Sequence, residues 1–310
     1  MIKDTFSDWL LCCVLLLALS AMPTLGQPSS TAILLKPLAP PAKGEFGELG
    51  FTISVSWMEG TLQMRFPETV HSRKGLQFID HFRADMPPIS MLDPVPNWTK
   101  DEGTGAVSYS CVTNEGVAFG GRTWPEEEKV EMEFFVENRS DEDLEGIALQ
   151  MCLVLTDTKA FGKKEDLSDT YTWIDGVFTS LSKTTPTPVE KGRRPWILIL
   201  TRKEAMNYSG ATEYPDGWWV VAQGADHDII ARTSADKRHI VAITWDDSPA
   251  FLMTNTAIPC LHAGPTRPVT LKPGEKNIRR GRVYLMANTP DELLKRYTQD
   301  RTEKTESSAN

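Results

Sequence analysis

Cys260 and His262, which stand two residues apart, are the side chains in this chain best suited by type and spacing to bind a metal. Side chains alternate along an extended strand, so both would point to the same face. A thiolate and an imidazole on one face supply half of a tetrahedral zinc site. Because no second Cys-x-His or His-x-His pair lies nearby, we expect no metal and no cofactor, with Cys260 packed in the core and His262 hydrogen-bonded to a loop carbonyl.

The segment Asp226-His227-Asp228 has residue types suited to proton transfer. A carboxylate beside an imidazole orients the ring and raises its basicity, which suits general acid–base catalysis near neutral pH. Adjacent strand residues point to opposite faces, so at most one of these carboxylates would assist. The catalytic candidates are therefore His262 or His227 as the acid and Asp226 as the base. The alternative interpretation is a solvated loop.

Arg122 and Trp124 combine the two features of a sugar site, a multi-donor guanidinium group and a flat apolar ring. Trp218 and Trp219 are consecutive in a predicted strand, so one should face the core and the other should face outward, where a binding surface often uses it. His81 lies in an apolar run and is either a core or a cleft residue. These five residues are the candidates for ligand binding.

Strands must position these side chains, because short apolar runs bounded by Gly, Pro, Asn or Asp follow one another along the chain. The predicted strands are 51–57, 61–66, 76–83, 106–112, 129–137, 144–155, 171–181, 196–201, 218–223, 229–233, 239–245 and 278–286. The clearest alternation, at 130–137, is expected to form a long antiparallel hairpin with 144–155. A chain turn is expected at Gly120-Gly121, before this hairpin.

One short helix near the C-terminus is also indicated. Thr289 suits its N-cap, Pro290 its first turn and Glu292 the capping box, and it should end at about Gln299. Many strands with one terminal helix predict an all-β fold, a large antiparallel two-sheet sandwich of the supersandwich type. The expected organisation is an extended leader at 27–45 that adds up to one strand, the sandwich domain with its helix at 46–299 and a disordered tail at 300–310.

The run of apolar residues from Leu10 to Leu19 predicts an export signal, because it is too short to cross a bilayer as an anchor. We place the cleavage after Gly26, with 18–21 as the second choice, and expect a secreted or periplasmic protein. No later segment is apolar enough to span a membrane, so no transmembrane segment is expected after cleavage. The formal net charge of −9 argues against a nucleic-acid partner.

Several catalytic signatures are missing from the sequence. It contains no G-x-x-x-x-G-K-[ST], G-x-G-x-x-G, G-x-S-x-G or H-E-x-x-H motif, so phosphate loops, dinucleotide folds, hydrolase elbows and zincins lack their defining residues.

Cys111, Cys152 and Cys260 follow the expected cleavage site and are too few for a disulfide framework. Buried free thiols are preferred over a single bridge between two of them.

Four pieces of the sequence, 121–126, 147–155, 259–263 and 271–285, together resemble a group of uncharacterised exported bacterial β-sandwich proteins. The shape of that group is similar to the galactose-mutarotase-like supersandwich. The resemblance implies a domain of the kind found in sugar epimerases, in parts of polysaccharide lyases and glycosidases, and in carbohydrate-binding modules. In mutarotases a histidine acts as acid on the ring oxygen and a carboxylate acts as base on the anomeric hydroxyl.

The function we expect is binding of a mono- or oligosaccharide by an exported β-sandwich, without conversion of the sugar. The first alternative is a sugar-active enzyme of the epimerase or lyase type, which would need a histidine and a carboxylate in one concave site. The second is a structural or protein-interaction module of the cell envelope, whose aromatic face would meet an unknown protein partner.

Overall fold

Alternating apolar and polar residues build two large β-sheets in this protein. The computed structural model describes residues 32–39, 48–80, 91–93, 95–161, 167–184, 196–208, 219–246, 249 and 251–307, all of which belong to the unit Thr31–Asn310. The expected export signal at 1–26 and the candidates His81 and Trp218 lie outside the described residues. No helix in the described part of the chain combines the length and apolarity needed to cross a membrane.

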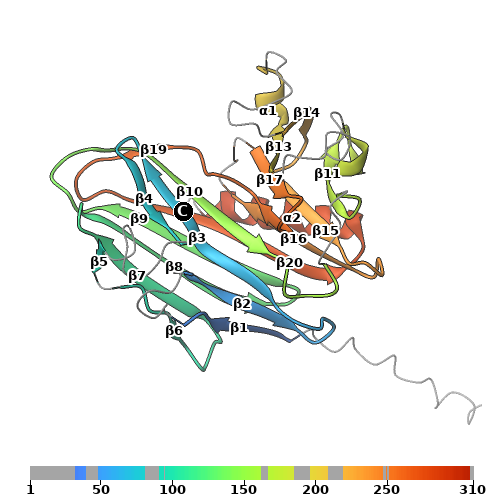
Figure 1. Ribbon diagram of the computed structural model, residues 1–310, viewed down its shortest axis with the longest axis horizontal. Helices are drawn as coiled ribbons and strands as arrows, with labels where there is room; N and C mark the ends of the chain where they lie inside the picture. Colours follow the sequence, from blue (N-terminus) through green and yellow to red (C-terminus); the bar gives the residue numbers. More distant parts are fainter. Residues whose placement is uncertain are drawn as a thin grey trace, which may run out of the picture. The chain divides into compact units, whose positions relative to one another are not determined.

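The first sheet takes its strands from within residues 33–79, 144–154 and 196–271 (Figure 1). One of its pairs, β13 with β14, is parallel, and the other pairs are antiparallel. In spatial order its strands are β1 (Ile33–Pro37), β2 (Gly50–Val55), β3 (Leu62–Ser72), β10 (Leu144–Val154), β18 (Cys260–His262), β17 (Phe251–Asn255), β13 (Trp196–Thr201) and β14 (Trp219–Ala225), with β4 (Gly75–Ile79) beside β3 and β19 (Val269–Leu271) beside β10.

The second sheet is antiparallel throughout its described pairs. In spatial order its strands are β12 (Val177–Ser180), β11 (Thr170–Ile174), β15 (Ile229–Thr233), β16 (His239–Trp245), β20 (Lys276–Ala287), β9 (Lys129–Asn138), β8 (Val117–Glu126), β7 (Val107–Thr113) and β5 (Leu92–Asp93), with β6 (Thr99–Lys100) beside β7. The predicted fold class, an all-β sandwich of two sheets, is confirmed.

The core lies between the two sheets, where the inward side chains of both meet. Phe66 of β3 reaches across from the first sheet and packs against two rings of the second. Its centroid lies 5.6 Å from that of Phe134 in a T-shaped arrangement and 6.1 Å from that of Trp245 in a stacked one. All three rings are buried, and each belongs to one continuous apolar cluster. This contact joins the sheets face to face.

The expected hairpin between 129–137 and 144–155 is wrong. Both segments are strands, but β9 pairs with β8 and β20, whereas β10 pairs with β3, β18 and β19 in the other sheet. The short connection between them therefore crosses from one sheet to the other. Each strand has one apolar face, and a strand needs only that face toward the core, so periodicity does not distinguish a hairpin from a crossing.

The expected turn at Gly120-Gly121 is also wrong, because both glycines lie inside β8. Neither has a positive φ; instead, both make room for neighbours. A Cβ on Gly121 would lie 2.2 Å from Cε1 of Phe66, and a Cβ on Gly120 would lie 2.4 Å from the carbonyl oxygen of Tyr109. Glycine in a strand interior often marks such a close approach.

The run at 171–181 forms two strands rather than one. Asp175 and Gly176, both at positive φ, make a two-residue turn between β11 and β12. The short helices η2 (Leu181–Lys183) and α1 (Arg202–Ala205) follow later. The leader at 27–45 contributes β1, which pairs with β2.

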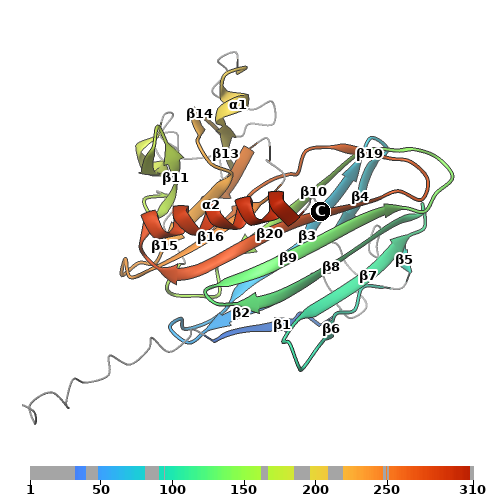
Figure 2. The same cartoon turned by 180° about the vertical axis from the view of Figure 1, so that it is seen from behind.

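The C-terminal helix α2 (Pro290–Ser307) begins where the sequence predicts and continues well past Gln299. Residues 300–307, expected in a disordered tail, are therefore helical. Figure 2 shows α2 lying across β15, β16 and β20. Leu293 and Tyr297 of the helix pack in an apolar cluster on this outer face of the second sheet. Charged contacts of Asp300 and Arg301, described below, extend the attachment beyond the apolar residues and explain why periodicity underestimates the length of the helix.

Candidate functional site

Charged and aromatic side chains form cross-strand rows on the outer face of the second sheet, over β8, β9 and β20. Strand pairing places Glu133 between Arg122 and Arg280 in one row. In the next row, Glu131 lies between Trp124 and Arg282. Residues two apart on a strand share a face, so the rows lie side by side.

Within these rows opposite charges meet across the strands. The Nε–H of Arg280 donates to Glu133 at 3.1 Å, and the Nε–H of Arg282 donates to Glu131 at 2.8 Å. The Arg122 guanidinium carbon lies 5.4 Å from the centroid of the Trp124 ring, a cation–π contact. The sequence-based pairing of Arg122 with Trp124 therefore corresponds to a real contact in the structure.

An open pocket of ≈ 400 Å³ lies over these rows. Its lining residues are Trp124, Glu126, Lys129, Glu131, Glu133, Arg280, Arg282 and Asp300. Seven of the eight are charged, and the eighth supplies a half-buried indole ring whose Nε1–H donates to Glu126 at 3.1 Å. A neighbouring pocket of ≈ 300 Å³ shares Lys129 and Asp300 and is otherwise lined by Glu127, Glu292, Arg296 and Gln299. Hydrogen-bond donors and acceptors therefore surround one flat apolar surface.

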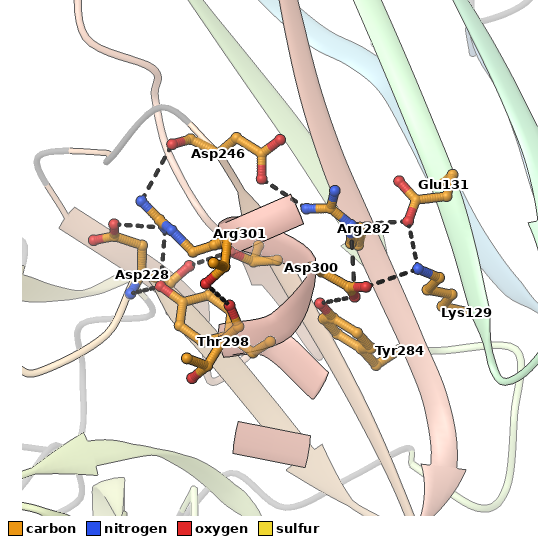
Figure 3. Close-up of polar contacts among 12 residues, drawn as sticks. Lys129, Glu131, Asp228, Asp246, Arg282, Tyr284, Thr298, Asp300 and Arg301 are labelled. Carbon is orange, nitrogen blue, oxygen red and sulfur yellow. Dashed lines mark hydrogen bonds and ion pairs between the residues drawn. The ribbon is translucent and has the colours of Figure 1, made fainter. Parts of the chain in front are cut away.

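The floor of the larger pocket is a network of ion pairs and hydrogen bonds between α2 and the sheet (Figure 3). Asp300 accepts hydrogen bonds from Lys129 at 2.9 Å and from the Tyr284 hydroxyl at 2.8 Å. Arg282 donates to Asp246 at 2.7 Å in addition to Glu131. Burial and the negative charge of Asp300 raise the pKa of Tyr284. Tyr284 therefore stays a hydrogen-bond donor over the physiological pH range.

A second set of contacts in Figure 3 attaches the end of α2 to β15 and β16. Arg301 donates to Asp228 at 3.0 Å, to the Tyr297 hydroxyl at 2.9 Å and to the backbone carbonyl of Asp246 at 3.3 Å. The Tyr297 hydroxyl in turn accepts from the backbone N–H of Asp228 at 3.1 Å. One turn of the helix thus holds the end of two strands through charge-assisted bonds.

A separate polar cluster is buried on the outer face of the first sheet, where β3, β10 and β18 meet. It contains Cys152, Cys260, His262 and Glu68, each at most 5% exposed. His262 Nε2 lies 3.1 Å from Cys260 Sγ, and its Nδ1 lies 3.4 Å from a carboxylate oxygen of Glu68. Among the described residues, Cys152, Cys260 and His262 form a group whose donor atoms all lie within 4.8 Å of one another.

Charge surrounds this cluster on its β3 side. Arg65 lies 3.5 Å from Glu68 and 3.4 Å from Asp80, measured from guanidinium nitrogen to carboxylate oxygen. Burial opposes protonation of His262, but its neighbours Cys152 and Glu68 favour it, so the pKa of His262 is raised. Burial raises the pKa of the Cys152 thiol.

The structure does not bring the three catalytic candidates together. His227 packs edge-on against the rings of Trp173 and Tyr297, with centroids 6.1 and 5.6 Å away, and burial lowers its pKa. Asp226 accepts from Arg202 at 2.8 Å and from the Gly176 N–H at 2.7 Å. Burial opposes ionisation of Asp226, but these bonds hold its pKa below the usual value.

His262 lies well apart from Asp226. In the first sheet β18 is separated from β14 by β17 and β13, a span of about 14 Å at the usual strand spacing of about 4.8 Å, and Asp226 follows the end of β14.

Of the ligand-binding candidates, Trp219 is 2% exposed and belongs to the apolar core. Only Arg122 and Trp124, among the described candidates, are neighbours on one surface.

Sequence reasoning missed most of the pocket. Glu131, Glu133, Arg280 and Arg282 alternate with apolar residues on two strands, and this pattern indicated only half-buried strands. The sequence predicts Asp300 in a disordered tail, whereas it lies in α2. The buried cluster was missed in part, because Cys152 and Glu68 stand far from Cys260 in the sequence and meet it only through strand pairing.

No protein-family model matches the chain, and no curated protein sequence matches it either. Solved structures with a similar arrangement include a galactose mutarotase-like protein from Lactobacillus casei, with 11% identity and a TM-score of 0.44, covering 81% of this chain and 100% of that one. A GalM/aldose epimerase homologue from C. elegans has 9% identity and a TM-score of 0.38, covering 84% of this chain and 100% of that one.

A third similar structure belongs to a larger enzyme. The α-N-acetylgalactosaminidase NagBb from Bifidobacterium bifidum, in complex with GalNAc, has 12% identity and a TM-score of 0.48, covering 89% of this chain but 38% of that chain. The structural neighbours thus include galactose mutarotase-like and aldose epimerase folds at low sequence identity.

Proposed function

We propose that this protein is an exported carbohydrate-binding protein that holds a mono- or oligosaccharide in the pocket beside Trp124. The observation that carries the proposal is the lining of this pocket, in which one indole ring stands among seven charged side chains. A sugar has the matching surface, because its ring carbons present an apolar face and its hydroxyls both donate and accept hydrogen bonds. An indole suits the apolar face, and carboxylates and guanidinium groups suit the hydroxyls.

The rim of the pocket has groups that can change partners. Arg280 and Glu133 pair at 3.1 Å, but their side chains are 45% and 33% exposed, so water already competes for them. Surface pairs of this kind contribute about 0–1 kcal/mol, so a ligand hydroxyl can replace one bond at little cost. By contrast, Arg282 and Glu131 are almost buried and form a rigid floor.

Binding without chemical conversion fits this pocket better than epimerase or lyase chemistry. The enzyme hypothesis needs a histidine and a carboxylate that converge on the ligand. Neither of the two pockets over the second sheet is lined by a histidine. His262 does have a carboxylate neighbour in Glu68, but His262 is fully buried on the other sheet.

The test is calorimetric titration of the full chain with mono- and oligosaccharides selected on a glycan array. We expect Trp124→Ala to weaken binding about tenfold or more, because the ring loses its stacking partner, and Trp124→Phe to retain part of it. Phe135→Ala is the matched control, since Phe135 is an aromatic residue on the same strand face of the sheet but outside the pocket lining. Binding of no carbohydrate, or equal binding by the wild type and Trp124→Ala, would refute the proposal.

Export has its own test. We expect the full chain, expressed in a bacterium with a general secretory pathway, to appear outside the cytoplasm with a new N-terminus at Gln27. Amino-terminal sequencing of the exported form identifies the cleavage site. Retention of an uncleaved chain in the cytoplasm would contradict this part of the proposal.

A further inference from the structure

The pairing of β10 with β18 joins metal-ligating side chains from distant parts of the sequence. In this antiparallel pair Val154 lies opposite Cys260 and Leu153 opposite Leu261, and the same register puts Cys152 opposite His262. Cys260 and His262 share a face of β18, as their spacing predicts. The side chains of Cys152, Cys260 and His262 therefore converge at one point on the outer face of the first sheet.

The distances match those of a zinc site. With Zn–S bonds of about 2.3 Å and Zn–N bonds of about 2.05 Å in tetrahedral geometry, two sulfurs lie about 3.8 Å apart and a sulfur lies about 3.5 Å from a nitrogen. Here the Sγ atoms of Cys152 and Cys260 and a ring nitrogen of His262 are all within 4.8 Å of one another, and Cys260 Sγ lies 3.1 Å from His262 Nε2. The separation of Cys260 Sγ and His262 Nε2 needs to widen by about 0.4 Å, and the two sulfurs, at most 4.8 Å apart, need to approach each other by no more than about 1 Å.

The imidazole is also oriented as a metal ligand requires. His262 Nδ1 faces Glu68 at 3.4 Å, so that Nε2 points at the thiols. Metal-binding histidines commonly donate the N–H of their other nitrogen to a carboxylate, which sets the tautomer. Glu68 is in turn held by Gln150, which donates to it at 2.6 Å, and by Arg65 at 3.5 Å.

Charge balance favours a divalent cation at this point. Two thiolates and a neutral imidazole offset the charge of Zn²⁺, and Arg65 stands beside Glu68, so an occupied site adds no uncompensated charge to a buried region. Sulfur and imidazole ligands select zinc over the hard cations Mg²⁺ and Ca²⁺, which take oxygen ligands.

We infer that Cys152, Cys260 and His262 bind one Zn²⁺ ion that links β10 to β18, with Glu68 as the residue that positions the imidazole. Three protein ligands leave the fourth position to an oxygen donor such as water. Since the three ligands are at most 2% exposed, the ion is taken up as the chain folds. This site is independent of the carbohydrate pocket, which lies on the other sheet.

The full chain is refolded with and without Zn²⁺, and its metal content is measured by mass spectrometry after dialysis. We expect about one zinc ion per chain and a higher Tm for the metal-loaded protein, because an ion that binds only the folded state stabilises it. Refolding with Co²⁺ supplies a readout of the ligands themselves, since cobalt bound to two thiolates gives intense sulfur-to-metal absorption in the near ultraviolet.

The variants Cys152→Ser and Cys260→Ser should lose this absorption and the bound zinc. Cys111→Ser is the matched control: Cys111 is also buried, but its thiol donates to the Phe119 carbonyl in the second sheet. It should keep both signals. Glu68→Gln preserves the size of the side chain and should retain cobalt absorption while the zinc affinity falls about 10–100-fold, as for other groups that orient a metal-bound histidine.

Thiol chemistry of the wild-type chain keeps the inference falsifiable if a variant fails to fold. In the folded, zinc-loaded chain we expect Cys152 and Cys260 to react with a thiol reagent faster once a chelator has removed the ion, while the reaction rate of Cys111 stays unchanged. A chain that binds no zinc on refolding, and whose Cys152 and Cys260 react at the same rate with and without the chelator, would overturn the inference. So would a Cys152–Cys260 disulfide in the exported protein, detected by peptide mass spectrometry.

Discussion

Asp300 of α2 and Lys129 of β9, 171 positions apart in the sequence, form an ion pair with 2.9 Å between Oδ1 and Nζ. The contact places the Asp300 carboxylate in the floor of the pocket that Trp124 also lines. The helix therefore does more than cover an apolar face of the sheet, because its Asp300 completes the polar lining of the proposed binding site.

The first prediction concerns this attachment. Asp300→Ala should lower the free energy of unfolding by about 2 kcal/mol, because Lys129 and Tyr284 each lose a charge-assisted hydrogen bond in a half-buried place. Chemical denaturation measures the change. Asp291→Ala, an exposed carboxylate on the same helix, serves as the control and should change stability by less than about 0.5 kcal/mol. Equal effects from the two variants would show that the attachment contributes nothing.

The second prediction tests the close packing between the sheets. Gly121→Ala should destabilise the protein by about 1–3 kcal/mol, since the added Cβ would lie 2.2 Å from Cε1 of Phe66 and the ring would have to move within a packed core. Thermal unfolding followed by circular dichroism reports the loss. Gly103→Ala is the control, because its Cβ would meet only the Asp101 side chain, at 3.3 Å. A Gly121→Ala protein as stable as the wild type would contradict the observed contact.

The third prediction concerns His239, which stacks on Trp57 with ring centroids 4.0 Å apart and planes 2° apart. Burial lowers the pKa of His239. The negative charge of Asp236 acts to raise this pKa, and the positive charge of Arg238 lowers it further. The folded state therefore binds the proton more weakly than the unfolded state. The contribution of His239 to stability is complete above the unfolded pKa of about 6.5 and is lost as the pH falls below that value.

Titration of the imidazole by NMR should give His239 a pKa below 6.5, with the resonance assigned by its disappearance in His239→Phe. In that variant the acid-side fall in stability should be smaller than in the wild type. A measured pKa at or above 6.5 would be inconsistent with the stacked, partly buried ring.

The fourth prediction follows from the contact of Arg202 with Asp226. Burial raises the pKa of Asp226, and the bonds from Gly176 and Arg202 lower it. Arg202→Ala removes the guanidinium and should therefore raise the pKa of Asp226. The Gly176 N–H then stays as the remaining described donor to this carboxylate. Because the Arg202 side chain is 48% exposed, water screens the ion pair and the loss of stability at pH 7 should be small.

The sign of the pH dependence is set by the lowered pKa of Asp226. Its stabilising effect is present above the unfolded pKa of about 3.9 and is lost as the pH falls through the lower folded value. The stability difference between the wild type and Arg202→Ala should therefore shrink between pH 7 and pH 3 in urea unfolding. Lys203→Ala, an exposed neighbour on α1, should show no such difference at either pH.

Much of the fold was predictable from local pattern, and the reasons are visible in single elements. Val130, Met132, Phe134 and Val136 occupy every second position of β9, and all four face the core of the protein as predicted. The partners of β9 were not predictable in the same way. Its apolar face would be buried equally well beside β10, and only the packing of the whole chain selects β8 and β20.

The residues of the two proposed sites also differ in how far they could be predicted from the sequence. Arg122 and Trp124 were identified from their types and spacing, and their contact is local to one strand. The other residues of the pocket come from β9, β20 and α2, and no short motif joins them. Cys260 and His262 have the types and spacing of half a metal site, although the sequence alone predicts no metal; Cys152 joins them from a strand more than a hundred residues earlier.

The sequence by itself determined the class of the protein, because the two-residue periodicity of side chains, the turn residues and the helix-initiating residues near Thr289 act over short distances along the chain. Only the tertiary structure decided which strands are neighbours, which outward rows of charge meet, and that Cys152 faces His262. The physical reason is that hydrophobic burial is non-directional: it specifies which face of a strand turns inward, but the choice of neighbour depends on the simultaneous packing of all strands.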